Sequence, residues 1–123
     1  MGVRLHSAAK YEVVYSQTAS FNYGHEHINN VLFALTEGDL WYEGDFLDSA
    51  NMLNGDRHLL LKNVEKIITP DNDWYYQEEL DETIAKMERD PYFGYTRQTL
   101  YEDLKKIIEQ GDPTEDKVHF FWS

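Results

Sequence analysis

The chain has 123 residues, a length at which one domain with one hydrophobic core is expected. It carries 23 acidic and 11 basic residues, which gives a formal net charge of −12. So acidic a chain lacks the clustered lysines and arginines that bind nucleic-acid phosphates, and an anionic membrane would repel it. We therefore expect neither direct binding of nucleic acid nor association with a membrane.

Cysteine is absent, which excludes disulfides and metal sites with thiolate ligands. No apolar run approaches the roughly 20 residues that a membrane-spanning helix needs. The sequence also does not open with the charged and then apolar segment that is typical of a signal peptide. Together these features favour a cytoplasmic location.

The two ends of the chain contain the strongest strand signals. Residues 10–17 and 117–122 are rich in β-branched and aromatic side chains, which alternate with a period of two as in a strand. Residues 1–9 are only weakly periodic and are expected to form a loose N-terminal arm, which leaves residues 10–123 as a single domain. We expect the two terminal strands to share one small sheet.

The sequence between these strands has a helical pattern. Apolar side chains recur at spacings of three and four residues in four stretches, as in amphipathic helices. They are Ile28, Val31, Leu32 and Leu35; Leu60, Val64, Ile67 and Ile68; Tyr76, Leu80, Ile84 and Met87; and Leu100, Leu104, Ile107 and Ile108. A further short helix is expected from Asp45 through Leu53, ended by Asn54-Gly55, and Trp41–Asp45 is compatible with a short extra strand.

Capping and turn residues give the expected helix boundaries. The first helix should stop at Glu37-Gly38 and the second before Pro70. Asp71 or Asp73 is expected to cap the third helix and Thr96 the fourth. The prediction is an α+β fold: a single small domain whose N- and C-terminal strands lie in one small sheet packed against four or five helices.

The acidic residues are unevenly distributed along the chain. No lysine or arginine occurs from Tyr11 to Asp56, and a second base-free stretch runs from Ile67 to Ala85. An acidic surface can simply keep a small protein soluble. The alternative is that an uncompensated acidic face binds a basic partner, whose approach it would accelerate.

Large aromatic residues interleave with the acids in residues 37–46, 73–76 and 90–95. Trp and Tyr commonly anchor protein interfaces, although Trp41, Trp74 and Phe93 can instead belong to the core. The predicted partner-binding residues are Glu37, Asp39, Trp41, Tyr42, Glu43, Asp45, Asp48, Asp73, Tyr75, Glu78 and Tyr92.

A catalytic or metal-binding pattern is hard to find. The helical zinc motif needs histidines at positions i and i+4, but the residue four positions after His25 is Asn29. His25 and His27 would converge only in an extended segment; otherwise they lie in the first turn of a helix. Glycine-rich phosphate loops, serine-nucleophile elbows and complete calcium loops are missing, so we predict a protein that is not an enzyme and that has no cofactor and no metal.

These features predict a non-enzymatic inhibitor that binds and blocks a basic protein that handles nucleic acid. The first hypothesis is an immunity protein that neutralises a nuclease toxin. The first alternative is an anti-CRISPR-like phage protein that mimics DNA to block a host defence nuclease. The second is a small metal-dependent enzyme or ligand-binding domain that uses His25, Glu26 and His27.

Overall fold

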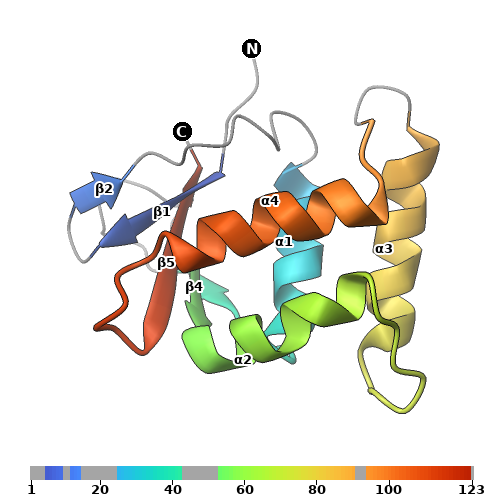
Figure 1. The fold of residues 1–123 in the computed structure, drawn as a ribbon, viewed down its shortest axis with the longest axis horizontal. Coiled ribbons are helices and arrows are strands. Elements are labelled where there is room, and N and C mark those ends of the chain that lie inside the picture. Colours follow the sequence, from blue (N-terminus) through green and yellow to red (C-terminus); the bar gives the residue numbers. More distant parts are fainter. Residues whose placement is uncertain (1–4, 10–11, 15–24, 43–52, 91–93, 123) are drawn as a thin grey trace.

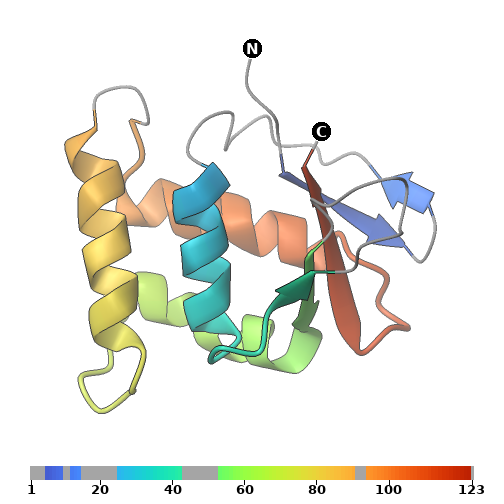
Figure 2. The ribbon, with the colours of Figure 1, turned by 180° about the vertical axis from the view of Figure 1, so that it is seen from behind.

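The computed structural model describes residues 5–9, 12–14, 25–42, 53–90 and 94–122. Its strands gather on one side of the molecule and its helices on the other, as the two opposite views show (Figures 1 and 2). This is the α+β fold that the sequence predicts, with strands from both ends of the chain in one sheet.

The sheet has five antiparallel strands in the order β2-β1-β5-β4-β3. They are β1 (Leu5–Ala9), β2 (Glu12–Val14), β3 (Trp41–Tyr42), β4 (Leu53–Asp56) and β5 (Lys117–Trp122). The central strand β5 has the bounds that the sequence predicts, and β3 is the short extra strand that the sequence allows. The two strand signals read from the sequence, now β2 and β5, share the sheet but are separated by β1.

The expectation of a loose arm over residues 1–9 is wrong for residues 5–9. These residues form β1, which pairs with β2 along one edge and with β5 along the other. The weak periodicity of the segment gave no sign of a strand, because the backbone pairing comes from its two neighbours in the sheet. Of the strand predicted over residues 10–17, residues 12–14 form β2, and the rest of that prediction lies outside the described residues.

In the described residues, four α-helices and one 3₁₀ segment accompany the sheet. They are α1 (His25–Leu35), α2 (Arg57–Asn63), the 3₁₀ segment η2 (Val64–Ile67), α3 (Gln77–Arg89) and α4 (Arg97–Glu109). Helices α1 and α3 pack side by side, and α4 crosses α1 (Figures 1 and 2). No helix in the described part of the chain is long and apolar enough to span a bilayer.

The helix boundaries follow local chemistry. Helix α1 ends as predicted, because Glu37 (φ 55°) and Gly38 (φ 81°) adopt left-handed conformations and the Gly38 amide donates to the Phe33 carbonyl at 2.8 Å, a helix C-terminal turn that favours glycine. Thr96 caps α4 as predicted: its hydroxyl accepts from the Thr99 amide. Such a cap stabilises a helix by about 1 kcal/mol.

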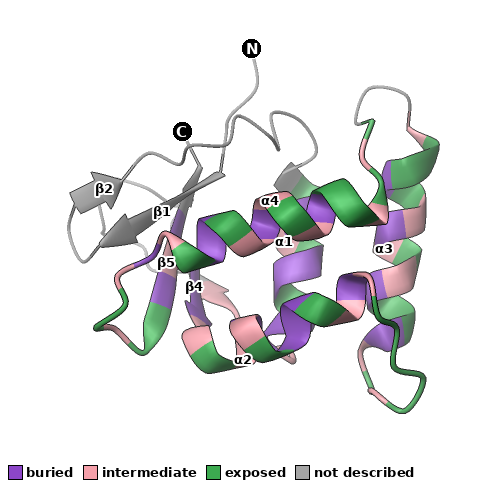
Figure 3. Cartoon of the chain, viewed as in Figure 1, coloured by how far each residue is buried: buried purple, intermediate pink, exposed green. Residues whose placement is uncertain are grey.

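The core lies between the helices and one face of the sheet (Figure 3). Most of the apolar positions in the four predicted stretches are buried; Ile68 and Tyr76 are half-buried and pack against the core. The sheet contributes Leu53, Val118 and Phe120. Burial of one such side chain contributes about 1.5–3 kcal/mol, which makes this layer the main source of stability.

The helix expected to end at Asn54-Gly55 is wrong at its described end, because Leu53–Asp56 form β4; the remainder of that prediction, residues 45–52, lies outside the described residues. A Cβ on Gly55 would lie 2.9 Å from Thr36 Cγ2 and 3.1 Å from Leu60 Cδ1. Gly55 therefore allows β4 to pass close to α1 and α2, rather than ending a helix.

Candidate functional site

Two large apolar side chains are exposed in the described part of the chain. Tyr75 is 85% exposed and Phe33 is 41% exposed. Both rings contact Tyr76, with centroid separations of 4.9 Å for Tyr75 and 6.4 Å for Phe33. Since Phe33 lies on α1 and the two tyrosines precede α3, the packing of α1 on α3 joins the three rings into one aromatic patch.

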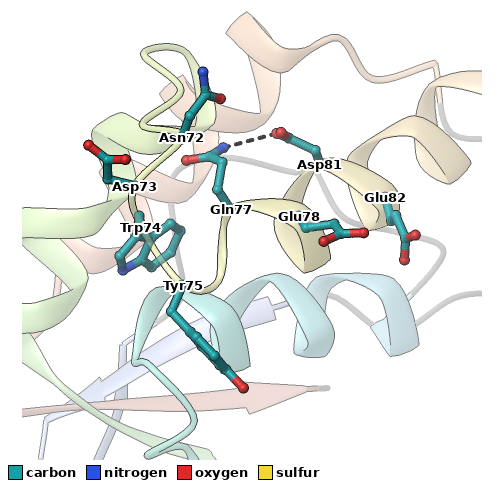
Figure 4. Close-up of a pocket in the computed structure, with 8 residues that line it drawn as sticks. All are labelled: Asn72, Asp73, Trp74, Tyr75, Gln77, Glu78, Asp81 and Glu82. Atoms are coloured by element: carbon teal, nitrogen blue, oxygen red, sulfur yellow. Dashed lines mark hydrogen bonds between the residues drawn. The ribbon is translucent and has the colours of Figure 1, made fainter.

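An acidic hollow of about 580 Å³ adjoins Tyr75 (Figure 4). Its lining contains four acids and no lysine or arginine; the residues are Asn72, Asp73, Trp74, Tyr75, Gln77, Glu78, Asp81 and Glu82. Glu78 and Glu82 project from the same side of α3, one turn apart (Figure 4). Asp81 pairs with Arg97 at 2.9 Å, whereas Asp73, Glu78 and Glu82 are exposed. We call the aromatic patch together with these three exposed acids the Tyr75 face.

The loop that presents Tyr75 is held by hydrogen bonds at both ends. The Asp73 amide donates to Asp71 Oδ1 at 3.0 Å, and the Asp71 amide donates to Gln77 Oε1 at 3.0 Å. Gln77 is 4% exposed, and its amide nitrogen donates to the Lys66 carbonyl at 3.4 Å. Asp71 and Asp73 thus close a turn before the helix, and α3 begins at Gln77 rather than at the predicted aspartate cap.

Glu37 and Trp74 form part of the scaffold beneath this loop. Trp74 is half-buried against the core, and its indole Nε1 donates to Glu37 Oε2 at 3.4 Å. Asn63 Nδ2 donates to the same oxygen at 3.0 Å, and Lys66 Nζ lies 5.0 Å from the Trp74 ring centroid. The carboxylate of Glu37, a predicted partner-binding residue, is therefore engaged within the molecule.

The structure divides the remaining predicted site residues among several places. Asp73, Tyr75 and Glu78 come together on the Tyr75 face. Asp39 is exposed, and Trp41 is half-buried on β3 with Lys117 Nζ 4.9 Å from its ring centroid. Of Tyr42 the structure describes the backbone, which pairs with β4. The predictions that lie outside the described residues are Glu43, Asp45, Asp48 and Tyr92.

The histidine pair lies in a helix. His25 and His27 begin α1, and positions i and i+2 on a helix do not face each other. The extended arrangement that a metal site would need is therefore replaced by the first turn of a helix. Elsewhere in the described residues, no three His, Asp or Glu side chains gather in the way that metal ligands do.

Three members of the Tyr75 face are not among the predicted site residues. Phe33 falls outside the apolar stripe of its helix, which was a usable sign that it faces away from the core. Tyr76 was assigned to the helical stripe of α3 but precedes that helix and links the other two rings. Glu82 lies one turn beyond Glu78 and follows from the helical spacing once α3 is placed.

The carboxyl group of Asp71 allows a prediction about acid stability. The Asp73 amide and the Lys66 ammonium lower the pKa of Asp71 below its usual value of 3.8. A carboxyl whose pKa is lower in the folded state stabilises that state above the usual pKa, and the contribution is lost as the pH falls toward the folded value. We expect urea midpoints measured from pH 6 to about pH 3 to fall more steeply for the wild type than for Asp71→Asn. Parallel curves for the two proteins would contradict the prediction.

Comparisons of the chain with protein-family models, with curated proteins and with solved structures give no match.

Proposed function

We propose that this protein is a non-enzymatic inhibitor that binds and blocks a basic, nucleic-acid-handling protein through the Tyr75 face. One observation carries the proposal: Tyr75 is 85% exposed beside an acidic hollow that has no basic residue in its lining. A large ring that gains nothing from burial in the free protein is available to be buried in a complex.

The arrangement resembles a protein-binding site in its physics. Aromatic anchors supply most of the binding energy in many interfaces, and surrounding charges guide the approach and orientation of the partner. Asp73, Glu78 and Glu82 are exposed and have no ion pair with another described residue, so their charges remain available to a partner. A surface that binds phosphates is rimmed with lysine and arginine, and carboxylates can occupy the same positions.

Two biological settings use this same chemistry, and the partner distinguishes them. An immunity protein would bind a toxin nuclease, whereas an anti-defence protein would bind a host defence nuclease and compete with its DNA. We favour the immunity setting, because an aromatic anchor with a few surrounding acids needs no extended phosphate-like row of charges.

The test is complex formation with purified basic nucleases, starting with any that is encoded beside this protein. We expect a complex whose association is faster at about 50 mM than at about 500 mM NaCl, because salt screens the attraction. Tyr75→Ala should weaken the complex by about 2 kcal/mol, or roughly 30-fold. Calorimetry and inhibition of nuclease activity measure these effects.

A matched charge reversal separates the face from the overall charge. Glu78→Lys and Glu102→Lys change the net charge equally, but Glu102 lies on α4, where acids and lysines are mixed. We expect Glu78→Lys to slow association and Glu102→Lys to have little effect. If Glu78→Lys and Glu102→Lys slowed association equally, the Tyr75 face would not be the binding site. The same would follow if neither Tyr75→Ala nor Glu78→Lys weakened the complex.

A further inference from the structure

A second hollow lies on the sheet, away from the residues that line the first. It has a volume of about 570 Å³ and is lined by Trp41, Asn54, Glu115, Asp116, Lys117 and His119. Trp41 pairs with Asn54 across β3 and β4, and Asn54 pairs with His119 across β4 and β5. Three adjacent strands therefore place Trp41, Asn54 and His119 in one row across the sheet.

The Trp41 ring is in contact with a cationic side chain of the same chain. Lys117 Nζ lies 4.9 Å from the ring centroid, within the range of a cation–π interaction. Lys117 is exposed, and in the described part of the chain its ammonium makes no ion pair. A single exposed contact of this kind is weak, so another cation can displace Lys117 from the ring.

The remaining groups around the hollow favour a cation that also donates hydrogen bonds. Asn54 is 1% exposed, and its Oδ1 accepts a hydrogen bond from His119 Nδ1, which leaves His119 Nε2 as an acceptor in the neutral ring. Glu115 and Asp116 also line the hollow, and Asp116 Oδ1 lies 3.9 Å from His58 Nε2. A guanidinium fits this set better than an ammonium, because it stacks on an aromatic ring and donates in a planar fork to carboxylates.

We propose that this hollow is a guanidinium-binding site, in which an arginine side chain of the partner replaces Lys117 on Trp41. The assignment of the arginine to a partner rests on the proposed function, whereas the affinity for guanidinium does not. Lys117 then acts as an internal occupant of the site that an incoming arginine must displace.

The test uses N-acetyl-arginine amide as the probe and N-acetyl-lysine amide and sodium chloride as comparisons. Binding is followed by the NMR signal of the Trp41 indole Nε1–H, which is assigned by its loss in Trp41→Phe. We expect saturable shifts with the arginine probe, weaker shifts with the lysine probe, and none that saturate with the salt. Equal effects of all three would overturn the proposal.

A variant that is expected to bind more tightly provides a test that misfolding cannot mimic. Lys117→Met removes the internal cation, so the arginine probe should bind about two- to fivefold more tightly. Lys86→Met removes the same charge from the exposed side of α3 and should leave the affinity unchanged. If Lys117→Met binds the probe no better than Lys86→Met, the hollow is not the guanidinium site.

The probe experiment contains no partner protein, so its failure is distinct from a failure of the proposed function. A complex that depends on Tyr75 while the probe does not bind would leave the Tyr75 face in place and remove the second site. Binding of the probe without any nuclease complex would retain the guanidinium site and remove the partner.

Discussion

Phe120→Ala is expected to lower the free energy of unfolding by about 3–5 kcal/mol. Phe120 lies on the central strand β5, is 0% exposed, and is the largest of the fully buried side chains in the described residues. It is paired across the sheet with Ser7 and with Leu53, so the strands on both sides hold the backbone around the vacated space. A cavity that cannot collapse adds to the loss of apolar burial.

Chemical denaturation followed by circular dichroism measures this loss. Tyr75→Ala is the matched control, since it also removes a large aromatic side chain but from a position that is 85% exposed, and it should change stability by less than about 0.5 kcal/mol. Similar losses in the two variants would mean that the helices and the sheet are not held together by this layer. The control also establishes that Tyr75→Ala is folded when its binding is measured.

Asn63→Asp is expected to lower the free energy of unfolding by about 3–5 kcal/mol at neutral pH. Asn63 is 0% exposed, and its Nδ2 donates to the Leu35 carbonyl at 2.9 Å and to Glu37 Oε2 at 3.0 Å. These bonds connect α2 to the end of α1 and to the Glu37 carboxylate, which also accepts a hydrogen bond from the Trp74 indole. The substitution replaces a donor by a charged acceptor that faces two acceptors.

Asn63→Ala separates the loss of the hydrogen bonds from the added charge. It removes the side-chain donor from the Leu35 carbonyl, while Glu37 Oε2 keeps the Trp74 indole as a donor, and it should cost about 1–3 kcal/mol. The new carboxyl group in Asn63→Asp should have a raised pKa, because it is buried beside the Glu37 carboxylate. The loss of stability caused by Asn63→Asp should therefore become smaller as the pH falls, since the neutral acid can again donate a hydrogen bond. If the difference in free energy of unfolding between Asn63→Asp and Asn63→Ala did not change between pH 7 and about pH 4, this account would be contradicted.

Most helices and the central strand were predictable because their signals are local. The stripe from Ile28 to Leu35 matches one face of α1, and the cap at Thr96 and the turn at Gly38 depend on neighbouring residues only. In residues 117–120 the alternation corresponds to burial, since Val118 and Phe120 are buried and Lys117 is exposed. Patterns of this kind record the environment of a segment in its own sequence.

The errors fall where distant contacts decide the local structure. Residues 5–9 form β1 because β2 and β5 pair with them. Asn54-Gly55 resembles a turn in sequence but forms part of β4, which pairs with β3 and β5. Gln77 bonds to Lys66 and Asp71 and so holds the loop before α3 in place. No sequence pattern links these positions. Pairing partners of this kind cannot be recovered from propensity.

The candidate site could be predicted only in part, because some of its contacts are between neighbours in the sequence and others are between distant segments. The interleaving of Asp73, Tyr75 and Glu78 is local, and the structure brings these three residues to one face. The approach of Lys117 to Trp41 is not local: the sequence around Trp41 has no lysine or arginine, and β5 supplies one from the other end of the chain. A base-free stretch of sequence is therefore not the same as a base-free surface.

The middle position of β5 in the sheet has a consequence for how the molecule folds. Its pairing with β1 joins segments from opposite ends of the sequence, so the entropy of closing a very long loop must be met before that pairing contributes. Helices reach their contacts within microseconds, whereas such distant pairings raise the contact order and slow the search. We therefore expect the helical layer to form before the sheet is completed, and the pairing of β5 with β1 to be a late step of folding.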